Sequence, residues 1–360
     1  MGLTSALDSV LGRLGSTRLH VLVVETPGSF ALRAAVEHGC GRRGWPLALS
    51  PADADALVVC GAVPEGAFAD AVEHVWSSLP GPRVRGEVTA VAAVPTVLQE
   101  LAAGYRAWDA TADPGSLTQP AESDGHADED MDHEDMGGMD MDMSGPGGIA
   151  LASGADDRDG LEMDVLHLPL GPVLAGWPSG WTVVVTLQGD VITEVDVQHA
   201  APLVASDITA YRLDAVAQLL ALAGADVLAV RAGRARDVRL GLATDGPDPA
   251  ALRRSIERSR ALRWALRHVG RVDTGDEPNW PAVWTGDAYD RLLRVLAPAD
   301  VDRHGDTDTD TDVSIPGEVL AAALPRLLGG SELAAARLTV ASLVGLVAVT
   351  SPSRNEEVSA

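Results

Sequence analysis

A long acidic stretch divides this chain into two parts, and it constrains the fold more than any other feature. Residues 111–159 contain almost no large aliphatic side chains, and ten acidic residues and no arginine fall within residues 122–142. Burying so few apolar groups does not offset the conformational entropy lost on ordering. We therefore predict a small domain over residues 1–110, an acidic, Met/His-rich disordered linker over 111–160, and a second domain over 161–360.

The composition allows two hydrophobic cores and excludes several classes of protein. The 360 residues are 46% hydrophobic but only 4% aromatic, so leucine, valine and alanine must supply most of the core. Acidic residues outnumber basic ones 52 to 27, and the net charge of −25 disfavours general binding to nucleic acid or anionic membranes. The two cysteines, Cys40 and Cys60, are too few for a disulfide-rich scaffold or for a four-cysteine iron–sulfur cluster within this chain. We predict a cytoplasmic protein with no signal peptide and no direct membrane span, since no run of about 18 apolar residues occurs.

The first part of the chain alternates short β-branched runs with stretches of helical spacing. The predicted strands are Leu19–Glu25, Pro46–Ser50, Ala56–Cys60 and Arg85–Ala93, and the predicted helices are Phe30–Cys40 and Glu65–Ser78. Buried strands separated by helices are typical of a parallel sheet with right-handed crossovers. The expected fold is a small three-layer α/β domain, flavodoxin-like in its parallel sheet.

The second part begins with a hairpin pattern and continues with helices. Residues 181–187 and 191–197 flank Gln188-Gly189-Asp190, which has the composition of a β-hairpin turn. The predicted helices that follow are Asp207–Ala223, Asp248–His268, Asp287–Leu296, Gly317–Leu328 and Glu332–Val349. We expect an α+β domain in which a β-hairpin precedes a helical bundle.

Three local patterns in the first part carry a resemblance to a known family. They are Gly28-Ser29-Phe30, the segment 50–57 (Ser-Pro-Ala-Asp-Ala-Asp-Ala-Leu) leading into Gly61-Ala62-Val63, and Val75-Trp76 followed by Pro80-Gly81-Pro82-Arg83. In this order they resemble the iron–sulfur small subunit of the complex I and energy-converting NiFe hydrogenase superfamily. In the second part, Leu168-Pro169-Leu170-Gly171-Pro172, Pro178-Ser179-Gly180 and the hairpin at Gly189-Asp190 resemble the large subunit of the same superfamily.

The chain departs from this family at the redox centres. Phe30 and Arg33 occupy the degenerate cluster positions, where neither side chain can ligate iron. No Cys-x-x-Cys pair is present to hold nickel, and Val173 and Leu174 occupy the stretch in which quinone-reducing members carry a histidine. The nearest histidine, His167, precedes that stretch. If the two domains pack together, Phe30 is expected to fill the space of the missing cluster.

The resemblance implies a non-catalytic, cluster-free structural or regulatory subunit, and no catalytic residue is assigned. Its partners would be membrane-bound complex I-like or hydrogenase-like subunits, which would hold it at the inner face of the membrane. The alternative is an electron-transfer or quinone-linked oxidoreductase subunit that uses a partner's redox centre. No nucleotide-binding or hydrolase motif supports a self-contained enzyme.

A third hypothesis concerns a cluster of soft metal ligands in the acidic stretch. Thioether and imidazole groups suit copper in its Cu(I) state, and nearby carboxylates attract cations. The alternative is a solvated linker in which the methionines are incidental. The candidate ligands are His126, Met131, His133, Met136, Met139, Met141 and Met143.

Two smaller patterns leave alternatives open. Arginines recur along residues 250–268, where a basic stripe on a helix could dock an acidic partner or lipid headgroups. Pairing with Glu257 and other acids of the chain is the competing interpretation. Cys40 and Cys60 could share a site, but Cys60 at the end of an apolar strand is typical of a small buried hydrophobe.

Overall fold

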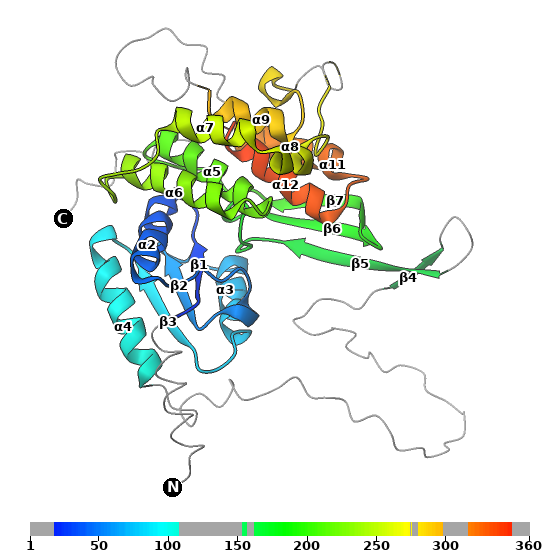
Figure 1. Ribbon diagram of the computed structural model, residues 1–360. Helices are drawn as coiled ribbons and strands as arrows, with labels where there is room; N and C mark the ends of the chain where they lie inside the picture. The colour runs from blue at the N-terminus through cyan, green and yellow to red at the C-terminus, as the bar shows by residue number, and fades with distance from the viewer. Residues whose placement is uncertain are drawn as a thin grey trace, which may run out of the picture.

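Two sheets, one parallel and one antiparallel, form the framework of the protein. The computed structural model describes residues 18–107, 153–156, 162–273, 275, 280–297 and 316–347 (Figure 1). The metal-ligand candidates at 126–143 and most of the predicted linker lie outside these residues. No helix in the described part of the chain is both long and apolar enough to span a membrane.

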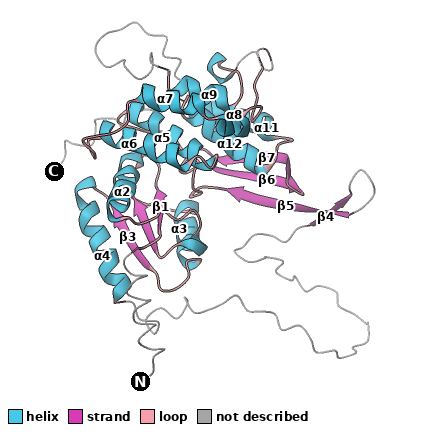
Figure 2. Ribbon diagram, in the orientation of Figure 1, coloured by secondary structure: helices cyan, strands magenta, loops and turns pink. Residues whose placement is uncertain are grey.

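The N-terminal sheet has three parallel strands in the order β1-β2-β3. These are β1 (Val21–Glu25), β2 (Ala56–Cys60) and β3 (Val84–Val88). Helices α2 (Phe30–Arg43) and α4 (Val94–Arg106) cover one face, and α3 (Ala67–Ser77) covers the other (Figure 2). All five residues of β2 are buried, which explains its uninterrupted apolar sequence. The predicted three-layer α/β arrangement is confirmed.

Two predictions in this region are wrong in detail. The strand predicted at 85–93 ends at Val88, residues 91–93 form a 3-10 turn, and the unpredicted α4 follows. Pro95 lies in the first turn of α4, where a missing N–H costs nothing. The strand predicted at 46–50 is reduced to a single parallel bridge between Leu47 and Val21.

The C-terminal sheet has four antiparallel strands in sequence order. These are β4 (Ser153–Asp156), β5 (Glu162–Leu170), β6 (Thr182–Gln188) and β7 (Val191–His199). The predicted hairpin is present as β6 and β7, but β5 was not predicted, and β4 falls inside the stretch predicted as linker. Alternate residues of β6 are buried because one face packs against helices α11 (Gly317–Leu328) and α12 (Leu333–Val344) (Figure 1).

The remaining helices pack beside this sheet around a second apolar cluster. They are α5 (Ile208–Leu222), α6 (Asp226–Arg239), α7 (Pro249–Arg258), α8 (Arg260–Leu266) and α9 (Ala288–Val295). Helix α6 was not predicted. The single helix predicted over 248–268 is two helices, because Ser259 leaves the helical conformation and its hydroxyl caps α8 by accepting from Leu262 N.

Candidate functional site

The candidate site lies at the carboxyl edge of the parallel sheet, where open α/β sheets usually bind ligands. We call described residues 18–107 the first region and those from 153 onward the second region. In Figure 1 the arrowhead of β1 points toward the helices of the second region, which covers this edge of the sheet. The Ser179 hydroxyl donates to the Glu25 backbone oxygen at 2.5 Å, and Gly180 is so close to the β1–α2 turn that a Cβ would lie 2.6 Å from Pro27 Cγ. Gly180 also has a φ of +76°, so the contact requires glycine.

The turn after β1 is tightly closed by its own hydroxyls. Thr26 Oγ1 donates to the Cys60 backbone oxygen at 2.9 Å and lies 2.9 Å from Ser29 Oγ. A Cβ at Gly61 would collide with both hydroxyls. Thr26 therefore joins the ends of β1 and β2, and Gly61 leaves room for the hydroxyls of Thr26 and Ser29.

Arg33 extends from α2 into the junction between the two regions. It is 8% exposed, and each of its three nitrogens donates to a different carboxylate. Nε contacts Glu25 Oε2, Nη1 contacts Glu37 Oε1 and Nη2 contacts Asp214 Oδ2, each at 2.5 Å. Asp214 belongs to α5, so the guanidinium joins the two regions directly.

A second buried arginine, Arg236 of α6, completes a ring of alternating charges. Its Nη1 donates to Glu37 Oε2 at 2.6 Å and to Asp214 Oδ1 at 2.7 Å. Arg33, Glu37, Arg236 and Asp214 thus form a closed cycle, which we call the ion ring. Three of the four side chains are less than a tenth exposed, and that of Glu37 is 17% exposed.

Three further titratable groups surround the ion ring. Asp237 Oδ1 accepts from Arg236 Nε at 3.0 Å and Nη2 at 2.8 Å, and His38 Nδ1 lies 2.9 Å from Asp237 Oδ2. Glu25 contacts the ion ring only through Nε of Arg33. Two guanidinium groups thus face four acidic side chains, those of Glu25, Glu37, Asp214 and Asp237, and His38 lies at the edge.

The two glutamates respond to this environment in opposite directions. Burial favours the neutral acid at both positions. At Glu37 the positive charges and hydrogen bonds of Arg33 and Arg236 outweigh burial and lower the pKa to about 2. At Glu25 burial prevails over the single arginine, and the pKa is raised. Burial lowers the pKa of both arginines, but the carboxylates outweigh it and the net shift is upward, so both guanidinium groups keep their charge.

Phe30 packs on the apolar side of the same junction. It is 2% exposed and packs with Ala34, Ala205, Ala210 and Tyr211, the last three from the second region. The Phe30 and Tyr211 rings meet edge to face with centroids 5.6 Å apart. Phe30 and Arg33 therefore both lie in the contact between the regions.

The cysteines and His167 do not join this site. Cys40 and Cys60 are fully buried free thiols, and burial raises the pKa of Cys40 to about 12 and that of Cys60 further. Both therefore remain protonated, which disfavours nucleophilic or metal-ligating thiolates. His167 is exposed on β5, with Nδ1 3.1 Å from the Thr186 hydroxyl.

Two hollows in the described part of the chain are lined by residues of the second region alone. No set of three or more histidine, cysteine or acidic side chains in that part of the chain is arranged to hold a metal ion. One hollow, of about 10 Å³, lies between α5, α9 and α12, enough for a single water. A larger hollow of about 330 Å³, beside Trp280 and Val319, lies among residues of the second region, away from the ion ring. The hydrogen bonds of the ion ring can hold the first region in a fixed position against the second.

Sequence reasoning found Phe30 and Arg33 but missed most of the ion ring. The only local signal is the spacing of Arg33 and Glu37, four residues apart on one helix. Comparisons of the chain with protein-family models, curated proteins and solved structures found no match. The resemblance to complex I and hydrogenase subunits therefore rests on the quoted sequence patterns alone.

Proposed function

We propose that this chain is a cluster-free structural or regulatory subunit of a membrane-bound complex related to NADH-quinone oxidoreductase or membrane-bound hydrogenase. One observation carries the proposal. Phe30 and Arg33, at the positions that resemble cluster-ligand positions, are both buried in the contact between the two regions and have all their partners there. On this proposal, protein side chains take the place of the redox group that the resembled family carries.

Finer features of the fold are consistent with this proposal. The bridge between Leu47 and Val21 puts an extended segment on the outer side of β1, so the sheet order resembles that of a flavodoxin-like domain. The helices that follow the β6–β7 hairpin would correspond to the helical bundle of the large subunit. On this proposal the chain lies at the cytoplasmic face of the membrane through its partner.

The ion ring would give such a subunit a rigid contact between its two regions. Each of its carboxylates bonds both arginines, so a shift of one region against the other would break several charge-assisted hydrogen bonds together. Fixed charges would then stand where the resembled family holds its cluster and quinone. The chain can present one rigid surface to its partners without a bound group.

The first test asks whether the chain belongs to a membrane complex. The full chain, tagged and expressed in the cells that encode it, would be extracted in mild detergent and separated by native electrophoresis. We expect an assembly much larger than the chain's own 37.3 kDa, containing quinone- or hydrogen-dependent membrane subunits identified by mass spectrometry. Migration of the chain alone contradicts the proposal.

The second test distinguishes the alternatives by metal content. The full chain and a variant lacking residues 126–143 would be purified without oxygen and analysed for iron, sulfide and copper. We expect neither iron nor sulfide. Stoichiometric iron and sulfide with visible absorbance would favour the electron-transfer subunit instead. Copper bound by the full chain and lost on deletion would assign metal handling to His126, His133 and the neighbouring methionines.

A further inference from the structure

Helices α7 and α8 form a basic island in an acidic protein. Residues 249–273 contain seven arginines and two acidic residues, a local charge of 7 − 2 = +5 in a chain whose net charge is −25. Salt largely screens the interaction between exposed charges that lie more than about 8–10 Å apart. A surface facing α8 therefore responds to this island more than to the distant acidic residues.

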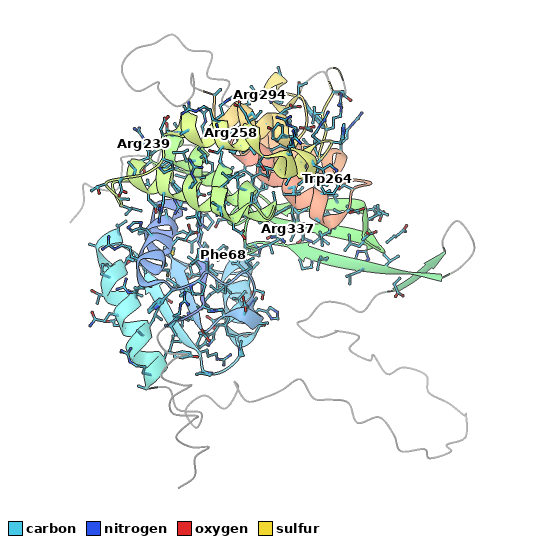
Figure 3. The ribbon with its side chains drawn as sticks, viewed as in Figure 1. Phe68, Arg239, Arg258, Trp264, Arg294 and Arg337 are labelled. Atoms are coloured by element: carbon cyan, nitrogen blue, oxygen red, sulfur yellow. The ribbon has the colours of Figure 1, made fainter. Side chains whose placement is uncertain are left out.

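One face of α8 combines these arginines with a large exposed ring. Leu262 and Leu266 are buried beneath the helix, and Trp264 on the opposite side is 84% exposed. Arg260 lies one turn before Trp264 on this face. Two more exposed arginines flank Trp264 in the chain: Arg263 directly precedes it, and Arg267 follows the last residue of α8. Figure 3 labels Trp264 on α8 and Arg258 at the end of α7.

Three of the seven arginines have the carboxylate partners that the competing interpretation requires. Arg253 pairs with Glu257 at 2.9 Å, Arg254 lies 3.9 Å from Asp248, and Arg271 pairs with Asp273 at 2.7 Å. Arg263 lies over the Tyr289 ring and donates to the Glu257 backbone oxygen. Among the described residues, Arg258, Arg260 and Arg267 have no carboxylate within ion-pair distance. These guanidinium groups are free to bind anions in this part of the molecule.

We propose that the α8 face, consisting of Arg260, Arg263, Trp264 and Arg267, binds the surface of an anionic phospholipid membrane. An indole ring favours the headgroup region, where its apolar body and its N–H both find suitable surroundings. Guanidinium groups bind phosphate in a bidentate geometry. A protein partner fits less well, because a stable interface buries about 800 Å² per side around an apolar centre and this face offers one large apolar side chain. The proposal adds direct lipid contact to the proposed function and does not depend on it.

The test measures sedimentation of the full chain with vesicles that contain no other protein. We expect binding to vesicles of equal parts phosphatidylcholine and phosphatidylglycerol, and none to phosphatidylcholine alone. Arg260→Ala with Arg267→Ala should weaken binding about 30-fold, since each basic residue near an anionic surface contributes about 1 kcal/mol. Trp264→Ala should weaken it about tenfold, and raised salt should weaken the wild type.

Matched variants on the first region provide the control. Arg42→Ala with Arg106→Ala removes the same charge from two exposed positions, and Leu49→Ala truncates an apolar side chain that is 78% exposed. Both should bind as wild type. Equal weakening by the control variants, or no preference of the wild type for anionic vesicles, would overturn the proposal. Undiminished vesicle binding by the α8 variants, with loss of a protein partner from the native assembly, would overturn it in favour of an acidic protein.

Discussion

The arginines of the ion ring and those of α8 are the same residue type in opposite circumstances. Arg33 and Arg236 are 8% and 4% exposed, and each meets carboxylates from both regions of the molecule. Arg260 and Arg267 are exposed and meet no carboxylate among the described residues. The first pair holds the protein together, and the second pair is available to something outside it.

Desolvation explains why the two sets differ. A guanidinium group taken out of water costs several kcal/mol unless carboxylates and hydrogen bonds replace its hydration. The ion ring meets that condition at every nitrogen of Arg33. An exposed arginine stays hydrated and needs no partner, so the stability of the fold depends little on where its side chain lies. We therefore expect substitutions in the ion ring to lower the free energy of unfolding strongly, and substitutions of the exposed arginines of α8 to change it little.

The largest effect is expected from Arg236→Met. Removing the cation leaves Glu37, Asp214 and Asp237 without it in a buried site, which should lower the free energy of unfolding by about 4 kcal/mol. Urea unfolding at neutral pH measures the change. Arg239→Met on the same helix is the matched control, because Arg239 makes one exposed pair with Asp207 and should cost under about 1 kcal/mol. Equal losses in the two variants would show that the ion ring is no stronger than a surface pair.

Phe30→Ala should have the next largest effect. Truncation leaves a cavity against Ala205, Ala210 and Tyr211, and the expected loss is about 3 kcal/mol. Thermal and urea unfolding both report it. Phe30→Leu, which keeps most of the volume, should recover more than half of the loss. If Phe30→Ala unfolds like the wild type, Phe30 does not stabilise the contact between the regions.

The sequence predicted the elements whose patterns are local. β2 was predicted with its observed bounds, the β6–β7 hairpin was predicted from its turn, and α11 was predicted residue for residue. Helix α6 was missed because its buried face consists of small alanines, which give no strong apolar period. β5 was missed because it pairs with β6 across an intervening loop.

The ion ring shows why the site was less predictable than the fold. Its bonds join residues 181 and 199 positions apart, and no local pattern in α5 or α6 marks Asp214 or Arg236 as partners of α2. The sequence did identify Arg33 as unusual, through its position in a family-like pattern. It gave no means of knowing that three carboxylates would surround that side chain.

Glu37 and Glu25 should affect the pH dependence of stability in opposite directions. Glu37 has a pKa lowered from 4.5 to about 2, so its ionised form stabilises the fold above pH 4.5 and that contribution is lost as pH falls. The expected loss from this residue is about 2 kcal/mol between pH 7 and pH 3. Thermal unfolding across this range should show the loss, and Glu37→Gln should remove most of the pH dependence while lowering stability at pH 7.

Glu25 should behave in the opposite sense. Its pKa is raised, chiefly by burial and against the charge of Arg33, with Asp214 and Glu37 also raising it. The ionised form is therefore less stable in the folded state, and stability falls as pH rises from the ordinary pKa through the raised one. Glu25→Gln should maintain or increase stability at pH 7. A loss in Glu25→Gln equal to that in Glu37→Gln would contradict the assigned directions.

The smallest effect is expected on α8, where substitution should change binding and leave stability nearly untouched. Arg260→Ala and Arg267→Ala remove exposed side chains without described carboxylate partners, so each should alter the free energy of unfolding by less than about 0.5 kcal/mol. Ser259→Ala gives a local comparison, because loss of the hydroxyl that caps α8 should cost about 1 kcal/mol. Urea unfolding of the three variants checks the order. Arginine variants that destabilise more than Ser259→Ala would mean that the α8 arginines stabilise the fold, and their effect on membrane binding could not then be assigned to lost contacts with lipid.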